Sequence, residues 1–330
     1  GGAVVMGRYL VSGAAGFIGA QVSTQLTLAG HEVIGIDNFN DAYDPILKDW
    51  RANQLRLQKG MTLIRQDICD RTGLDALFRD YGPFEAVINL AARAGVPYSV
   101  KDPWVYYETN VTGTLNLLDC CKRYQVPKFV LASTSSLYGT HNPMPFREDA
   151  DTSRPLSPYA ASKKAAETIS YTYHHLYGLD VTILRYFTVY GPAGRPDMSL
   201  FRFCQWIAEE RPLRLYGDGS FTRDFTFVED IARGTICGLK PVGYDVFNLG
   251  NDQPHSMMQT IQILEMLLEE KANIQFLPTQ DVDMPATWAN IDKANQILGW
   301  KPQVSLEEGL NRLVNWYLAE RSWASQVLTP

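Results

Sequence analysis

The chain has 330 residues, of which 45% are hydrophobic and 20% are charged, and its formal net charge is −6. These values are typical of a globular protein with one large or two modest domains. The acidic balance, spread without charge runs, excludes a nucleic-acid or anionic-membrane surface. No apolar run approaches the length of a membrane span, and we expect no signal peptide.

The five cysteines have no spacing typical of a metal site or a redox motif. They lie in apolar contexts, and the five histidines do not cluster with them. We therefore expect reduced thiols, no metal site and a cytoplasmic location. The cysteines are Cys69, Cys120, Cys121, Cys204 and Cys237.

The first predicted elements are a strand, a glycine turn and a helix. The stretch VSGAAGFIG, at 11–19, contains Gly13, Gly16 and Gly19. In a dinucleotide-binding turn the first glycine allows the tight turn, the second a close approach to a pyrophosphate, and the third close packing of the helix. The helix, predicted over 17–29, would add free N–H groups and a positive dipole end. A glycine turn without a ligand is the alternative.

The second strand, HEVIGID, ends on Asp37. An acid about 20 residues after the glycines can accept both ribose hydroxyls of adenosine. Its charge would repel a 2′-phosphate, which favours NAD over NADP. A solvated acid at a strand end is the alternative for Asp37 alone.

Strands and helices then alternate up to residue 187, which predicts a doubly wound parallel sheet of the Rossmann type. The strand MTLIRQDI ends on Asp67 and Ile68, which suit an edge contact to adenine. The strand FEAVINLAA runs into small residues that leave room for a cofactor. Further strands are expected at PKFVLAST and VTILRYF, and helices at 47–58, 74–82, 105–124 and 158–177.

Past residue 187 the alternation is lost. We predict a loop at 188–198, helices at 199–210 and 228–239, and short strands at FTFV, DVFNLG and NIQFLP. This pattern predicts a smaller mixed α/β substrate domain over the carboxyl ends of the sheet. We expect residues 7–187 to form the cofactor domain, with 225–250 returning to it, and 188–224 and 251–325 to form the substrate domain.

Three residues form a candidate proton relay. Tyr159 and Lys163 are four apart on a predicted helix, so they share one face. A tyrosine base must be a phenolate, and a nearby ammonium together with a positive nicotinamide ring would lower its pKa from about 10. Thr134, at the end of the fifth strand, could share the substrate proton. A Tyr-x-x-x-Lys pair on a helix surface is the alternative.

Together, GAAGFIG, Asp37, LAA, STSSLYG, Tyr159-x-x-x-Lys163, RYFTVYGP and the late RDF at 223–225 resemble the extended short-chain dehydrogenase/reductase family. Within that family the chain resembles the NAD-dependent nucleotide-sugar epimerases and dehydratases. The stretches AARAGVPYSV, TSS and RYFTVYGPAGRPDM are most similar to the UDP-glucuronate 4-epimerases.

The resemblance implies a tightly bound NAD+ and a UDP-sugar, UDP-glucuronate or UDP-galacturonate. Tyr159 would take the proton from the sugar 4-hydroxyl, and the C4 hydride would pass to NAD+. The 4-keto sugar would rotate and receive the hydride on its other face. The net reaction would be an isomerisation.

Sister activities differ at the residues after the fifth strand. Related 4,6-dehydratases carry an Asp-Glu pair there and UDP-glucuronate decarboxylases a Glu, whereas this chain has Ser135 and Ser136. Hydroxyls can donate to a substrate carboxylate without a repelling charge. We therefore expect Thr134, Ser135, Ser136 and Thr188 to hold the sugar carboxylate. Thr188 stands where neutral-sugar 4-epimerases usually have Asn.

For the UDP group, Arg223 is the candidate for the diphosphate, because a guanidinium matches phosphate oxygens in pairs. Tyr216 could stack on uracil. Arg195 is a further candidate for the sugar pocket, with a loop ion pair to Asp197 as the alternative. Family enzymes often have a second diphosphate Arg near residues 279–281, where this chain has Thr, Gln and Asp.

The resemblance also implies two sets of contact residues. The expected cofactor residues are Gly13, Gly16, Phe17, Ile18, Gly19, Asp37, Asn38, Asp67, Ile68, Leu90, Ala91, Ala92, Asn110, Ser133, Tyr159, Lys163 and Tyr186. The expected substrate residues are Arg93, Thr134, Ser135, Ser136, Tyr159, Thr188, Arg195, Tyr216 and Arg223.

Three alternatives to a uronate epimerase remain. They are a UDP-glucose/UDP-galactose 4-epimerase, a decarboxylase or dehydratase that uses the same oxidised intermediate, and an NAD-binding regulatory protein. The last class typically loses the Tyr or the Lys, which this chain keeps. We also expect a homodimer, formed through the helices near 110–124 and 158–177 as a four-helix bundle.

Overall fold

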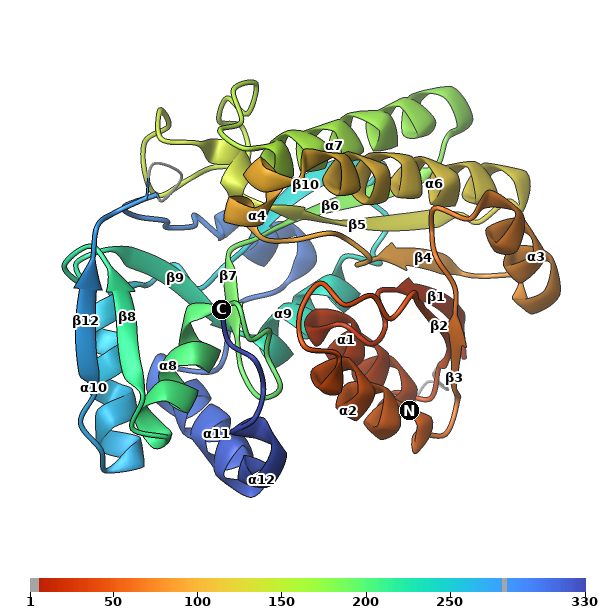
Figure 1. Cartoon of the computed structure of the whole chain (residues 1–330). Helices are drawn as coiled ribbons and strands as arrows, with labels where there is room; N and C mark the ends of the chain where they lie inside the picture. The colour runs from red at the N-terminus through yellow and green to blue at the C-terminus, as the bar shows by residue number, and fades with distance from the viewer. Residues whose placement is uncertain (1–5, 281–283) are drawn as a thin grey trace.

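A seven-stranded parallel sheet forms the centre of the molecule (Figure 1), seen here in a computed structural model that describes residues 6–280 and 284–330. The strand order is β10-β6-β5-β4-β1-β2-β3. This arrangement confirms the predicted doubly wound fold. The strands are β1 (Arg8–Ser12), β2 (Glu32–Asp37), β3 (Met61–Arg65), β4 (Ala86–Asn89), β5 (Lys128–Thr134), β6 (Asp180–Tyr186) and β10 (Tyr244–Leu249).

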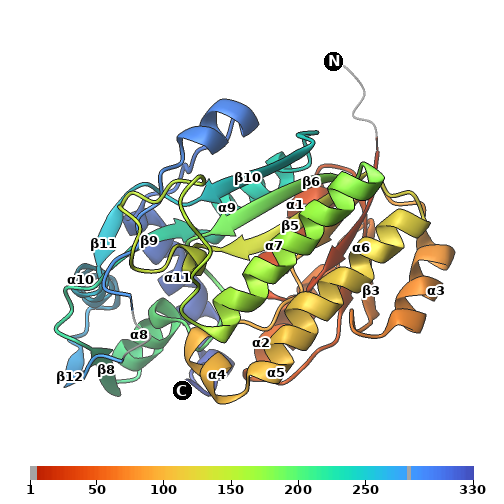
Figure 2. The same cartoon turned by 90° about the horizontal axis from the view of Figure 1, so that it is seen from above.

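Helices cover both faces of this sheet (Figures 1 and 2). One face carries α1 (Phe17–Leu28), α2 (Pro45–Arg56) and α9 (Val228–Cys237), and the other carries α3 (Arg71–Tyr81), α6 (Gly113–Arg123) and α7 (Pro158–Tyr177). Each face has its own apolar core. With both faces buried, the central strands are apolar almost throughout, as parallel strands are.

The long helix α7 begins and ends where the sequence predicts. The Ser157 hydroxyl accepts a hydrogen bond from the Ala160 N–H, and Pro158 occupies the first turn. Gly178 ends the helix in the left-handed conformation, with φ of 70°. These are the typical signals of a helix start and a helix end. They fix the position of the two residues of the predicted relay that α7 carries.

The helix predicted over 105–124 is present, but a π-helical turn that was not predicted divides it into three contiguous segments. They are α5 (Pro103–Tyr107), the π-helical turn η1 (Glu108–Thr112) and α6. The buried Asn110 lies in η1, and its side chain bonds the backbone of Arg93 and the hydroxyl of Ser162. A π-turn inside a helix changes the direction of such a side chain. A further short helix, α4 (Val96–Lys101), was not predicted.

A smaller part of the chain gathers beside the large sheet (Figure 1). Two small sheets have the orders β11-β9-β7 and β12-β8. Part of the predicted loop at 188–198 is wrong, because its first three residues form β7. The strands are β7 (Thr188–Tyr190), β8 (Pro212–Tyr216), β9 (Thr222–Phe227), β11 (Pro254–Ser256) and β12 (Asn273–Leu277). The helical segments are α8 (Ser199–Ala208), α10 (Met257–Leu268), η3 (Ala294–Leu298), α11 (Leu306–Ala319) and α12 (Arg321–Ala324).

None of the helices in the described ranges is long and apolar enough to cross a membrane.

Candidate active site

The glycine turn between β1 and α1 packs backbone directly against backbone and leaves no room for a Cβ at Gly13 or Gly19. Gly13 has φ of +70°, and a Cβ there would lie 2.8 Å from the backbone nitrogen of Ala91. A Cβ on Gly19 would lie 2.0 Å from the carbonyl oxygen of Gly13. The turn can therefore be this tight only with glycine at both positions. Phe17 and Ile18 follow in the first turn of α1, whose free N–H groups face the same turn. Such a cradle of free N–H groups at a helix start is chemically suited to a pyrophosphate.

The Asp37 carboxylate lies beside this turn at the end of β2. It is buried and accepts hydrogen bonds from the backbone N–H of Ala15 at 3.1 Å and of Phe39 at 2.9 Å. Lys48 of α2 pairs with it at 2.9 Å. The sequence analysis did not identify Lys48. Because this ammonium offsets the carboxylate charge, repulsion of a 2′-phosphate is weaker than the sequence alone suggests.

The carboxyl end of β4 borders the turn, and the carboxyl end of β3 lies beside that of β2. The Ser12 hydroxyl accepts the N–H groups of Leu90 and Ala91, at 3.1 Å each, and donates to Asn89 at 2.7 Å. Ser12 thereby fixes the segment 90–92 against β1. The sequence analysis did not identify Ser12. Asp67 is exposed, within 3.5 Å of Asn38, while the Ile68 side chain is buried in the core.

Three further expected cofactor residues, like Asp37, use their side chains within the protein. The Ser133 hydroxyl donates to Glu167 at 2.6 Å. The Tyr186 ring lies in the core, with its hydroxyl 2.7 Å from that of Thr235. The Asn110 side chain binds Arg93 and Ser162, as described above. Because their side chains are bonded within the protein, these three residues stabilise the segments around the site.

The predicted relay residues come together at the end of β5. Lys163 is buried, and its ammonium donates to the Ala132 carbonyl at 2.9 Å. Burial raises the pKa of Tyr159, while a hydrogen bond from Thr134 and the positive charge of Arg195 act in the opposite direction. Burial lowers the pKa of Lys163 to about 8. The positive charge of a bound nicotinamide ring would further lower the pKa of Tyr159 and favour its phenolate.

A buried ion pair lies one helical turn beyond Lys163. The Glu167 carboxylate accepts two hydrogen bonds from Arg185 of β6, at 2.8 and 3.0 Å. Both side chains are 4% exposed. The Glu167 charge also acts to raise the pKa of Lys163. Glu167 and Arg185 were missed by the sequence analysis, although the i, i+4 spacing from Lys163 is a usable signal.

The hydroxyl residues expected to bind a carboxylate lie on neighbouring segments. Ser135 and Ser136 begin η2 (Ser135–Tyr138), and the Ser136 N–H donates to the Thr134 hydroxyl at 3.1 Å. Within 6–280 and 284–330, the Ser135, Ser136 and Thr188 hydroxyls have no hydrogen-bond partner. All three side chains are half-buried. They are therefore free to donate to a ligand.

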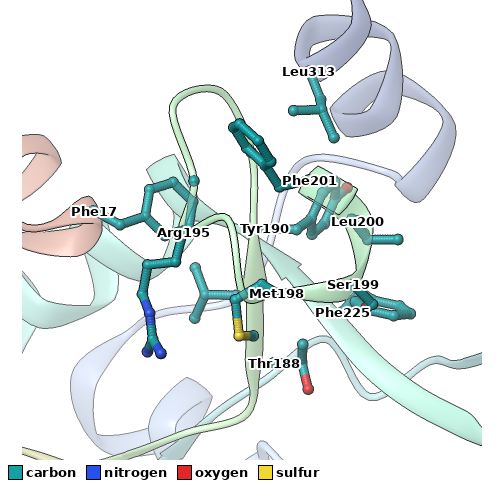
Figure 3. A pocket seen from close by; sticks show the side chains of 13 residues that line it. Phe17, Thr188, Tyr190, Arg195, Met198, Ser199, Leu200, Phe201, Phe225 and Leu313 are labelled. Carbon is teal, nitrogen blue, oxygen red and sulfur yellow. The ribbon is translucent and has the colours of Figure 1, made fainter. Parts of the chain in front are cut away.

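Arg195 follows β7 in a loop that also lines a small hollow between α1 and the smaller part. Figure 3 shows Arg195 and Thr188 with their polar ends directed away from Leu313. Arg195 pairs with Asp197, with Nε 3.1 Å from the carboxylate. The ion pair that the sequence analysis considered therefore exists. The positive charge of Arg195 also lowers the pKa of Tyr159, so the pair does not exclude a role of Arg195 at the site.

The expected UDP residues lie in the smaller part. Tyr216 ends β8 and Arg223 lies on β9, both half-buried. The Arg223 guanidinium donates to the Thr222 carbonyl at 2.8 Å. The Arg93 guanidinium lies 5.7 Å from the ring centre of Tyr98. Of the stretch 279–281, Asp281 lies outside the described residues.

Comparison with known proteins decides the family. A family model described as GDP-mannose 4,6 dehydratase matches residues 10–313. A UDP-glucuronate 4-epimerase of Thermodesulfobacterium geofontis is 54% identical over 312 residues, which cover 94% of this chain and 96% of that protein. The chain belongs to the NAD-dependent epimerase and dehydratase family. The predicted family membership is confirmed.

Solved members of the epimerase and dehydratase family share the fold over almost their whole length. A UDP-glucuronic acid 4-epimerase from Bacillus cereus, in complex with UDP-glucuronic acid and NAD, is 37% identical with a TM-score of 0.89 and covers 95% of this chain and 99% of that chain. A UDP-glucose 4-epimerase from Thermotoga maritima, with UDP-glucose, is 29% identical with a TM-score of 0.86, covering 95% and 99%. In this chain, the described residues contain no cluster of His, Cys, Asp and Glu that could hold a metal ion.

Proposed function

We propose that the chain is a UDP-glucuronate 4-epimerase that interconverts UDP-glucuronate and UDP-galacturonate with a bound NAD+. The single observation that carries this proposal is the set of hydroxyls at Ser135, Ser136 and Thr188, at the edge of the sheet that also carries the half-buried Tyr159 and the buried Lys163. The 54% identity to a UDP-glucuronate 4-epimerase supports it. The glycine cradle and Asp37 suit NAD+, which supplies the hydride acceptor and donor at the sugar C4.

Tyr159 is the proposed base. As a phenolate it takes the proton from the sugar 4-hydroxyl when the ketone forms, and it returns that proton when the ketone is reduced. Lys163, as an ammonium, favours the phenolate electrostatically. Thr134 donates a hydrogen bond to the phenolate oxygen of Tyr159. The relay thus holds one proton on the protein between the two halves of the reaction.

The carboxylate group sets a second requirement. The 4-keto intermediate of a uronate is a β-keto acid, which loses CO₂ when the bond to the carboxyl carbon aligns with the carbonyl π system. We propose that the hydroxyls of Ser135, Ser136 and Thr188 hold the carboxylate out of that alignment, with Arg195 shaping the pocket. Thr134, expected from the sequence to join them, has a single hydroxyl proton, which it donates to Tyr159. The absence of an acid at 135 and 136 supports epimerisation over decarboxylation or dehydration.

The other contact residues have matching proposed roles. Arg223 binds the diphosphate, Tyr216 stacks on uracil, and Arg93 lines the sugar side. The large sheet, including β10, forms the cofactor domain, and the smaller sheets form the substrate domain. The proposed cofactor wall consists of Gly13, Gly16, Phe17, Ile18, Gly19, Asp37, Asn38, Asp67, Ile68, Leu90, Ala91, Ala92, Asn110, Ser133 and Tyr186.

We also propose a homodimer in the cytoplasm. Exposed apolar side chains on α5, α6 and α7 support a two-fold contact there, among them Trp104 at 81% and Leu176 at 59% exposure. All five cysteines are free, which supports a reducing compartment. Sedimentation of the purified protein tests the dimer, and a monomer at micromolar concentration would contradict it.

Proton NMR of the NAD-loaded protein with UDP-glucuronate, and separately with UDP-glucose, tests the proposed activity. We expect the anomeric and H4 signals of UDP-galacturonate to grow in the first sample only. A pentose product would establish decarboxylation instead, and turnover of UDP-glucose alone would establish a neutral-sugar epimerase.

A further inference from the structure

Arg51 of α2 is a buried cation whose partners are neutral. It is 2% exposed, and within the described ranges no carboxylate forms an ion pair with it. A buried charge must be compensated by hydrogen bonds or by an opposite charge. Arg51 has hydrogen bonds alone, and all of their acceptors belong to two loops of the candidate active site and to Tyr43.

The first loop is the glycine turn. One terminal nitrogen of Arg51 donates to the Ala15 carbonyl at 3.1 Å and to the Tyr43 hydroxyl at 2.6 Å. The N–H of Ala15 donates in turn to Asp37, which pairs with Lys48. Lys48 and Arg51 are three residues apart, so they lie on one face of α2. This face of α2 therefore contacts the glycine turn through Arg51 and Asp37 through Lys48.

The second loop carries Arg195. The Ala193 carbonyl accepts two hydrogen bonds from Arg51, at 2.9 and 2.8 Å, and the Gly194 carbonyl accepts one at 3.3 Å. Ala193 has φ of 55°, a left-handed conformation that costs free energy for a residue with a Cβ. Such a conformation persists only where its surroundings hold it. Arg51 supplies these contacts two residues before Arg195.

We propose that Arg51 is a positioning residue that fixes the loop carrying Arg195 to the cofactor turn. Its planar fork binds carbonyls from both loops at once, which a lysine could not do. The hollow between Phe17 and Gly194 lies where the two loops meet. Through this bridge the glycine turn and Arg195 keep a fixed relative position, and Arg195 acts on Tyr159.

Hydrogen exchange of the NAD-loaded protein tests the bridge directly. The variants are R51M, which removes the donors, and R51K, which keeps the charge. We expect faster exchange of backbone amides both at 191–198 and at 13–16, with a larger effect for R51M. The matched control is R56M on the same helix, because Arg56 is exposed and, in the part of the chain that the structure describes, bonds Asn53 alone. Faster exchange at only one of the two loops, or at neither, would overturn the proposal.

Substrate kinetics supply a second readout, which rests on the proposed function. For R51M we expect KM for UDP-glucuronate to rise by about 2- to 30-fold with a smaller change in kcat, and the dissociation constant of NAD+ to rise in the same range. If R51M does not fold, Tyr43→Phe removes one acceptor and should change both constants in the same direction. Unchanged constants would overturn the proposal. A wild-type protein inactive on UDP-glucuronate would overturn the function alone, because exchange and NAD+ binding test the bridge independently.

Discussion

Thr134 and Tyr186 are register partners at the carboxyl ends of β5 and β6. The chain beyond Thr134 continues into Ser135 and Ser136, and the chain beyond Tyr186 reaches Thr188 two residues later. Because the two strands are parallel, both segments leave the sheet at the same edge. This register brings hydroxyls that are about fifty positions apart in the sequence to one side of the proposed sugar pocket.

Variants that lack the Ser136 or the Thr188 hydroxyl should release CO₂ from the 4-keto intermediate. For Ser136→Ala and Thr188→Ala we expect a rise of about 10- to 100-fold in KM for UDP-glucuronate, since each loses a hydrogen bond to a charged group. A fraction of the 4-keto sugar should also decarboxylate, because the carboxylate is less firmly held. The measurement is ¹³CO₂ release from carboxyl-labelled substrate. Thr62→Ala, an exposed position on β3, is the control. Unaltered KM without any added CO₂ would contradict the carboxylate role.

Loss of the Thr134 hydroxyl should move the pH profile. The Thr134 hydrogen bond lowers the pKa of Tyr159, so Thr134→Val raises that pKa. A base with a higher pKa is deprotonated only at higher pH, and the acidic limb of kcat against pH should shift upward. We expect kcat at pH 7 to fall by about 100-fold. Thr134→Ser, which keeps the donor, should retain the wild-type limb. An unshifted limb in Thr134→Val would show that the bond does not act on the base.

The alternation of strands and helices was sufficient to predict the large sheet, and Ser157 with Pro158 marked the start of α7. The glycines, Asp37, Tyr159 and Lys163 were identified because their spacing matches known dinucleotide-binding and Tyr-x-x-x-Lys patterns. Lys48, Arg51 and Arg185 were missed, since they belong to no such pattern and only the tertiary fold sets their partners. The π-helical turn at 108–112 was missed for a similar reason. Its residue Asn110 bonds Arg93 and Ser162, which lie on two other segments of the chain.

The Glu167–Arg185 pair should matter for stability. Arg185→Met leaves a carboxylate with 4% exposure without its cation, and we expect a loss of about 3–5 kcal/mol in the free energy of unfolding. The double variant Glu167→Gln with Arg185→Met should be more stable than the sum of the single losses predicts. Urea denaturation of all four proteins measures this coupling. Additive losses would contradict a coupled pair.

The close approach of Gly19 to Gly13 should make the turn intolerant of a methyl group. A Cβ at Gly19 would lie 2.0 Å from the Gly13 carbonyl oxygen, so Gly19→Ala must shift the backbone. We expect a loss of about 1–3 kcal/mol in stability and a weaker affinity for NAD+. Gly178→Asn is the control, because no atom of the described residues lies within 4 Å of its Cβ position and Asn tolerates its φ of +70°. Wild-type NAD+ affinity in Gly19→Ala would contradict the tight-turn account.

The most direct test of the proposed reaction follows two labels in one turnover. UDP-glucuronate carrying deuterium at C4 and ¹³C at C6 is incubated with the NAD-loaded protein in ordinary water. The proposed mechanism predicts UDP-galacturonate that keeps both labels, because the hydride returns to C4 and the carboxylate is retained. Loss of the deuterium to water, or recovery of the ¹³C as CO₂ with a UDP-pentose, would contradict it.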